Sequence, residues 1–280
     1  MQIEKTKELG LCFGVKRAVK LLEEAASKYG EIETLGLVAH NQQLVEKLIK
    51  AGVKPVKHLD QVQGKILAIT THGTSPKILS EVKASHIHTI DTTCPIVRKA
   101  QNTARELADA GLDVIIFGEK EHSEVQGLLG WAEDKGIATL DVKQIDALDR
   151  KPYHLGIISQ TTQIQRTLIE FVGQLIATLA SRSSEIRFIN TLCRIVQRRQ
   201  ETTIRLATRS QIMIVIGGYN SANTRRLAEA CSQIVETHLV ETANDLDAAW
   251  FTEKESVGIT GGTSTPDEII EEVIAKLKSL

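Results

Sequence analysis

Short apolar runs alternate with longer helical patterns along this 280-residue chain, and this alternation is what most constrains its fold. The runs have the length and the flanking residues of buried strands. They are Ile66–Thr70, Val114–Phe117, Leu155–Ser159, Ile212–Ile216 and Val257–Thr260. Alternating strands and helices predict an α/β protein with mostly parallel sheets.

The segments between these runs carry apolar residues at three- and four-residue spacing, which predicts amphipathic helices. These segments are Val15–Tyr29, Gln42–Ala51, Pro76–Ala84, Val97–Ala110, Val125–Trp131, Gln163–Ala180, Ile195–Thr208, Thr224–Val235 and Pro266–Leu280.

The chain is too long for one comfortable hydrophobic core, so two or three domains are expected. Cys12, Cys94 and Cys193 recur at similar intervals along it. We therefore expect three similar α/β units, each beginning near a cysteine. Their predicted limits are 13–94, 95–192 and 193–280, the last completed by 1–12.

Charge and hydropathy exclude several classes of partner. The net charge is -1 and the pI about 6.7, so there is no overall basic field for nucleic acid or an acidic membrane surface. No apolar run reaches the roughly 20 residues that span a bilayer. The first residues, Met1–Lys5, include charges and no secretory apolar core. We expect a soluble cytoplasmic protein without nucleic-acid or membrane partners.

Six segments rich in His, Ser, Thr, Asn and Gly lie where strands should give way to helices. They are 38–41, 70–73, 121–124, 159–162, 217–223 and 261–266. Ligands of open α/β sheets bind at such strand ends, where helix N-termini favour anions. One such segment alone is usually only a helix cap. Six together predict a site for a phosphate or diphosphate.

Three of the four cysteines precede or open a predicted helix, which favours the thiolate that ligates metals. Cys12, Cys94 and Cys193 could bind zinc, include a nucleophile, hold an iron–sulfur cluster, or be buried structural residues. Their spacing does not decide between these roles. Cys231 lies inside a predicted helix and is interpreted as a small buried apolar residue.

Glu124 follows His122 by two residues, so a carboxyl group shares a loop with a candidate anion ligand. Such a carboxyl can act as a general acid if its surroundings raise its pKa. The alternative is an acid that only complements the helix dipole.

Taken together, these residues resemble the 4-hydroxy-3-methylbut-2-enyl diphosphate reductase family, which catalyses the last step of the methylerythritol phosphate route to isoprenoids. The likeness covers nearly the whole chain and depends on the order and spacing of its motifs. The segments that carry it are 10–15, 40–41, 72–73, 93–95, 122–124, 160–162, 190–193, 220–223 and 264–267.

The resemblance implies a pseudo-threefold trefoil of three α/β domains around a central [4Fe–4S] cluster. Cys12, Cys94 and Cys193 would each supply one thiolate, which leaves one iron without a protein ligand. By the same likeness, Glu124 would deliver protons and Thr161 would order the substrate hydroxyl. The diphosphate would be bound by His40, His72, His122, Ser221, Asn223 and Ser264.

The implied reaction is the reductive dehydroxylation of 4-hydroxy-3-methylbut-2-enyl diphosphate to isopentenyl and dimethylallyl diphosphate. Because no flavin or dinucleotide motif is present, an external donor such as ferredoxin or flavodoxin is expected. The chain departs from the family pattern at Ser123, at Ala222 and at Arg194–Val196, where Pro, Ser and an Ala-Thr pair are common. Rival interpretations are a metal-binding sensor and a zinc-dependent hydrolase of a phosphorylated metabolite.

Overall fold

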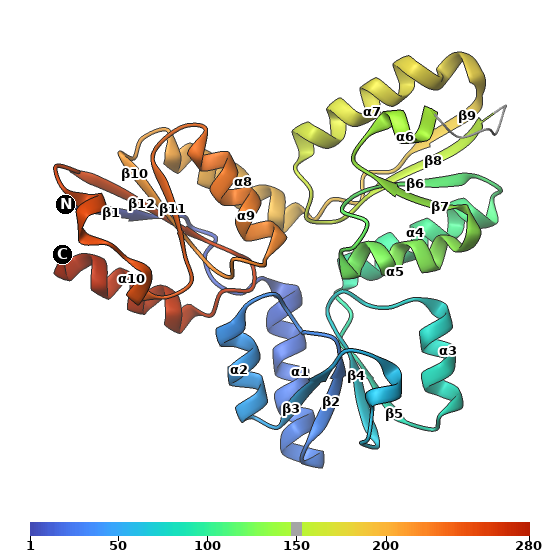
Figure 1. Cartoon of the computed structure of the whole chain (residues 1–280), viewed down its shortest axis with the longest axis horizontal. Coiled ribbons are helices and arrows are strands. Elements are labelled where there is room, and N and C mark those ends of the chain that lie inside the picture. The colour runs from blue at the N-terminus through green and yellow to red at the C-terminus, as the bar shows by residue number, and fades with distance from the viewer. Residues whose placement is uncertain (147–152) are drawn as a thin grey trace. The chain divides into compact units, whose positions relative to one another are not determined.

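The structure is a computed structural model that describes residues 1–146 and 153–280. Its strands form three four-stranded sheets, ordered β1-β12-β10-β11, β3-β2-β4-β5 and β7-β6-β8-β9 (Figure 1). Neighbouring strands such as β10 and β12, β4 and β5, or β6 and β8 run parallel. Three parallel sheets with flanking helices confirm the predicted α/β class and the three similar layers.

The chain divides into two compact units. The first unit comprises Met1–Ser27, Leu37–Val53 and Arg194–Leu280, and the second comprises Lys28–Gly36 and Lys54–Cys193. The first unit holds the sheet β1-β12-β10-β11, and the second holds the other two sheets apart from Val53. The domain limits expected from the cysteine spacing remain a prediction.

In the first unit, one helix covers one face of the sheet and two helices cover the other (Figure 1). On β10 the residues Ile212, Ile214 and Ile216 pack with α10, whereas Met213 and Val215 pack with α8 and α9. The strands are β1 (Gln2–Lys5), β10 (Ile212–Ile216), β11 (Thr237–Val240) and β12 (Ser256–Gly261). The helices are α1 (Phe13–Tyr29, its last two residues in the second unit), α2 (Gln42–Lys50), α8 (Arg194–Ala207), α9 (Ala222–Ser232) and α10 (Asp267–Ser279).

The sheet β7-β6-β8-β9 of the second unit is also covered on both faces. On β6, Ile115 and Phe117 pack with α7, whereas Val114 and Ile116 pack with α4 and α5. The strands are β6 (Asp113–Phe117), β7 (Gly136–Thr139), β8 (Tyr153–Ser159) and β9 (Ser183–Phe188). The helices are α4 (Pro95–Asp109), α5 (Ser123–Ala132), α6 (Val142–Asp146) and α7 (Gln165–Leu179).

The remaining sheet of the second unit is built around β4, whose Leu67, Ala68 and Ile69 are buried. Its strands are β2 (Ile32–Leu35), β3 (Val53–Val56), β4 (Ile66–Ile69) and β5 (His88–Asp91), and α3 (Pro76–Ala84) joins the last two. Short 3₁₀ helices complete the chain at Leu59–Gln61, Glu133–Lys135, Ala180–Arg182, Ala243–Asp245 and Ala248–Phe251. No helix of the described residues is long and apolar enough to cross a membrane.

The same structural pattern recurs in all three sheets. Each of the three nominated cysteines follows an edge strand, β1, β5 or β9, and directly precedes a helix, α1, α4 or α8. The third residue after the cysteine is a buried valine in every case, namely Val15, Val97 and Val196. The three helices therefore turn the same face inward relative to their cysteine.

Candidate active site

Each nominated cysteine is held by the same backbone contact. Its N–H donates to the carbonyl of a threonine that lies two residues beyond the end of a strand. The three pairs are Cys12 with Thr263 at 2.9 Å, Cys94 with Thr71 at 3.0 Å and Cys193 with Thr161 at 2.9 Å. Strand ends therefore position all three cysteines at the start of a helix.

Each of the three cysteines can offer a thiol as a metal ligand from the start of a helix. All four cysteines are free thiols, and Cys12, Cys94 and Cys193 each directly precede a helix. Cys231 is different because it is fully buried in α9, and burial raises the pKa of its thiol to about 12. The structure thus confirms the interpretation of Cys231 as a core residue and leaves three candidate ligands.

A buried carboxylate is bound directly to one of these loops. Glu124, in the first turn of α5, is 2% exposed. Its Oε1 accepts from the Thr161 backbone N–H at 2.6 Å, and its Oε2 accepts from the Thr161 hydroxyl at 3.0 Å. Because the Thr161 carbonyl holds the N–H of Cys193, the acid is one residue removed from a candidate metal ligand.

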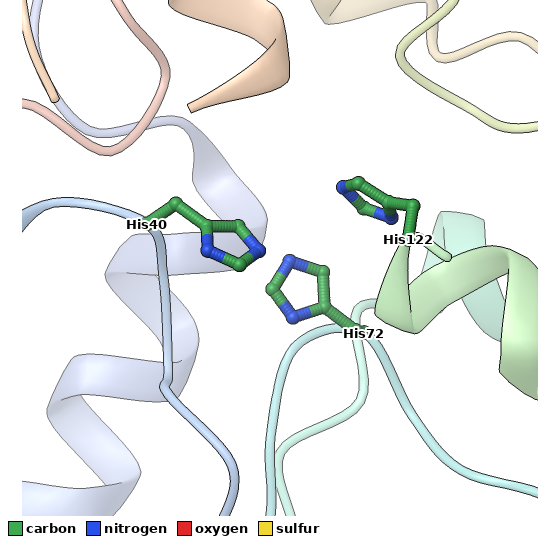
Figure 2. Close-up of side chains that lie close together, drawn as sticks. All are labelled: His40, His72 and His122. Atoms are coloured by element: carbon green, nitrogen blue, oxygen red, sulfur yellow. The ribbon is translucent and has the colours of Figure 1, made fainter. Parts of the chain in front are cut away.

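Two histidines lie beside each other in the same unit. The rings of His72 and His122 meet edge to face, with centroids 5.5 Å apart (Figure 2). His122 caps α5, and its Nδ1 accepts from the backbone N–H of Glu124 at 3.1 Å. An Nδ1 that accepts leaves the proton on Nε2, so His122 presents a donor to an anion.

In the first unit, hydrogen bonds join the end of β10 to the loop after β12. The Gly262 N–H and the Thr265 hydroxyl both donate to the carbonyl of Ile216, at 2.8 and 2.9 Å. Ser221 caps α9 after the loop that follows β10, Asn223 lies in the first turn of α9, and the loop after β12 carries Ser264; all three are buried.

Asn223 is the clearest sign of a ligand in this unit. It is 4% exposed, and neither its amide oxygen nor its amide nitrogen has a hydrogen-bond partner among the described residues. A buried amide left without partners costs free energy, so Asn223 is a candidate contact for a polar ligand.

His40 completes this group. The backbone of the loop after β10 comes so close that a Cβ on Gly218 would lie 2.3 Å from the His40 carbonyl oxygen. A cavity of about 410 Å³ opens beside it, and its lining comes from Leu37, His40, Asn41, Gln42, Val45, Asn220 and Glu241. Burial, and then the charge of Arg225, lowers the pKa of His40 below 6.5.

The nominated residues therefore fall into two sets, one in each unit. The first unit holds Cys12, His40, Ser221, Asn223 and Ser264, and the second holds Cys94, Cys193, His72, His122, Glu124 and Thr161. Within each unit the residues lie at strand ends or helix starts, as the sequence predicted.

Sequence reasoning did not predict how the cysteines are held. Thr71 and Thr263 lie in the nominated segments 70–73 and 261–266, but nothing in the sequence indicated that their carbonyls accept from Cys94 and Cys12. Arg199, which is 2% exposed, was also missed. A usable signal existed, because three-residue spacing places Arg199 on the same buried helix face as Val196.

Comparison with known proteins decides the family. The family model described as LytB protein matches residues 3–278. The chain belongs to the LytB protein family. A relative from Dehalococcoides mccartyi strain CBDB1, named 4-hydroxy-3-methylbut-2-enyl diphosphate reductase, is 42% identical over 280 residues, which cover 100% of this chain and 99% of the relative. A protein of the same name from Geobacter metallireducens is 38% identical over 281 residues and covers 100% and 98%.

Two solved structures of this family share the fold. One is (E)-4-hydroxy-3-methyl-but-2-enyl diphosphate reductase, described as the terminal enzyme of the non-mevalonate pathway. It is 36% identical, with a TM-score of 0.74 and full coverage of both chains. The other is the E-1-hydroxy-2-methyl-but-2-enyl-4-diphosphate reductase of Plasmodium falciparum, with 26% identity, a TM-score of 0.93 and coverage of 99% of this chain and 88% of that one.

Proposed function

We propose that this chain is a 4-hydroxy-3-methylbut-2-enyl diphosphate reductase, an oxidoreductase of isoprenoid biosynthesis. Its products would be isopentenyl diphosphate and dimethylallyl diphosphate. Relatives that carry this name match the chain from end to end. The structural observation that carries the proposal is the continuous contact from the buried Glu124 through Thr161 to Cys193. This contact supports the proposal because a reductive dehydroxylation requires a proton donor close to the reacting oxygen.

Cys12, Cys94 and Cys193 would hold a [4Fe–4S] cluster that has one iron without a protein ligand. When bound, this cluster supplies electrons and a Lewis-acidic iron for the substrate oxygen. The three thiols suit this role because each is fixed by its backbone N–H at a helix start. Cys231, which burial keeps protonated, would take no part.

The diphosphate would be bound by donors from the strand ends, namely His40, His72, His122, Ser221, Asn223 and Ser264. His122 is prepared to donate through Nε2 because its Nδ1 already accepts from Glu124. The amide of Asn223 gains a partner when an oxygen-rich ligand binds. Backbone N–H groups at the start of α9 would replace the hydroxyl that Ala222 lacks.

Glu124 would supply protons to the reacting end of the substrate, and the Thr161 hydroxyl would orient the substrate hydroxyl. The C–O bond breaks, two electrons and two protons are consumed, and the hydroxyl leaves as water. The electrons would come from an external carrier such as ferredoxin or flavodoxin. We expect the protein to act in the cytoplasm.

The direct test is anaerobic turnover. The reconstituted protein is mixed with 4-hydroxy-3-methylbut-2-enyl diphosphate and chemically reduced viologen, and the products are separated by chromatography. We expect both five-carbon diphosphates to form and viologen to be oxidised. Dephosphorylated products without viologen oxidation, together with bound zinc, would instead support the hydrolase alternative.

A further inference from the structure

Arg199 is a buried charge in a position where the two other helices that follow a nominated cysteine have alanine. It is the sixth residue after Cys193 in α8, and the sixth residues after Cys12 and Cys94 are Ala18 and Ala100. Ala18 and Ala100 are fully buried, and Arg199 is 2% exposed. Burying a guanidinium is costly unless hydrogen bonds compensate for the lost water. The departure from alanine therefore calls for a role that a small apolar side chain cannot perform.

The guanidinium joins two loops that meet at Cys12. Its Nη1 donates to the carbonyls of Gly261 and Gly262, both at 2.9 Å, and its Nη2 donates to the carbonyl of Gly10 at 2.8 Å. Gly10 lies two residues before Cys12, and Gly262 precedes Thr263. The Thr263 carbonyl accepts the Cys12 N–H. Arg199 thus binds the backbone of both segments that form the contact between Cys12 and Thr263.

The loop on the other side of this contact continues into a nominated substrate residue. Ser264 directly follows Thr263 and is 6% exposed. The planar guanidinium of Arg199, with its fork of N–H donors, therefore holds the Cys12 turn and the start of the Ser264 loop together. A lysine could donate to these carbonyls only as a single point charge and could not reproduce the fork.

We propose that Arg199 is a positioning residue for Cys12 whose fixed charge also favours the reduced state of the bound cluster. This inference rests on the proposed function. A guanidinium stays protonated at every physiological pH, and charges act strongly in a buried, poorly solvated setting. Charge and hydrogen bonds near an iron–sulfur cluster set its reduction potential. A permanent cation bound to the backbone of the Cys12 turn would make it easier to add an electron to a cluster that Cys12 helps to hold.

The test uses two substitutions that separate the charge from the fork. Arg199→Gln removes the charge, and Arg199→Lys keeps the charge but removes the fork. Arg198→Gln and Arg198→Lys are the matched controls, because Arg198 is the preceding residue of the same helix and is exposed. Each variant is purified and reconstituted anaerobically. The midpoint potential is measured by EPR-monitored titration, and iron loss is followed during incubation with a chelator.

We expect Arg199→Gln to shift the midpoint potential to a more negative value. Arg199→Lys should keep a potential near that of the unaltered protein but lose iron several times faster to the chelator. Both Arg198 variants should match the unaltered protein in both measurements. If Arg199→Gln does not fold, the iron loss of Arg199→Lys decides the positioning role.

Two results overturn the inference while leaving the proposed function intact. They are an Arg199→Gln protein with an unshifted potential, and an Arg199→Lys protein that loses iron at the unaltered rate. An unaltered protein that takes up no cluster would overturn the proposed function, and this inference with it.

Discussion

At the scale of single residues, the contact between Glu124 and Thr161 joins acid chemistry to a candidate metal ligand. Both carboxylate oxygens of Glu124 are occupied by Thr161, so the acid is held in one orientation. Because the Thr161 carbonyl also accepts the Cys193 N–H, the acid and the candidate metal ligand share one contact residue.

Glu124→Gln should keep the cluster but lower turnover by about 10²–10⁴-fold, the usual contribution of a positioned general acid. The amide has nearly the same shape but cannot deliver a proton. Turnover with reduced viologen and iron content are measured on the same sample. Glu121→Gln, an exposed acid three residues earlier, is the control and should stay fully active. A fully active Glu124→Gln protein would disprove the proton-delivery role.

His40 should make the stability of the protein depend on pH. Because burial and Arg225 lower its pKa in the folded state, the unfolded state binds the proton more tightly. The contribution of His40 to the free energy of unfolding is therefore fully present above the unfolded pKa of 6.5. It is lost as the pH drops towards the lower folded pKa. His40→Asn should weaken this dependence.

The measurement is the thermal unfolding temperature of the apoprotein at about pH 7.5 and about pH 5.5, on either side of the unfolded pKa. His58→Asn serves as the control because His58 is an exposed histidine. An unchanged pH dependence in His40→Asn would show that His40 does not titrate in this way.

At the scale of elements, the sites are made by loops that approach one another closely. Gly218 allows the loop after β10 to pass against the carbonyl of His40, with room for no side chain. Gly218→Ala should push these backbones apart, at a cost of about 1–3 kcal/mol typical of overpacking. We expect a higher KM for the diphosphate substrate and unchanged iron content.

Gly173→Ala is the matched control for this substitution. Gly173 lies in α7, and nothing lies within 4 Å of the position that its Cβ would take. Alanine should therefore leave KM unchanged and slightly raise the unfolding temperature, because it favours the helix. A Gly218→Ala protein with unaltered KM would show that the close approach does not shape the substrate site.

The five strands that the sequence predicted are β4, β6, β8, β10 and β12, all of them inner strands of their sheets. Their continuous apolar runs reflect burial on both faces. The other strands of the described residues were missed, namely β1, β2, β3, β5, β7, β9 and β11. The edge strands β1, β5 and β9 gave no apolar run because they carry charged or polar residues, as in QIEK, HTID and SSEIRF. The amphipathic periodicity predicted every long helix to within a few residues of its ends.

The candidate site was predicted as a set of residues but not as a set of contacts. Motif order nominated Glu124, Thr161 and Cys193 separately, because each has a characteristic neighbourhood in the sequence. That Thr161 bridges the other two depends on the packing of α5 beside the end of β8, which local sequence does not encode. Arg199 was not predicted from the sequence for a similar reason, since its partners are backbone carbonyls distant in the chain.

At the scale of the whole molecule, the three cysteines follow the edge strands of three different sheets. A cluster bound by all of them would couple three α/β layers, and ligands that bind only the folded state raise stability by mass action. We expect anaerobic reconstitution with iron and sulfide to raise the unfolding temperature of the unaltered protein.

Cys94→Ser should bind much less iron and gain no stability on reconstitution, because one of the three ligands is lost. Cys231→Ala is the control for iron content, since this cysteine lies in the core of α9 and should not affect the cluster. Full iron content in Cys94→Ser would contradict the ligand assignment.

The most direct test of the central claim is Mössbauer spectroscopy of anaerobically reconstituted, ⁵⁷Fe-enriched protein, with and without 4-hydroxy-3-methylbut-2-enyl diphosphate. We predict a four-iron cluster in which one iron differs from the others, and a change confined to that iron when substrate is added. Zinc in place of iron, or a cluster that substrate leaves unchanged, would contradict the assignment of this chain as a reductase that acts through an open iron.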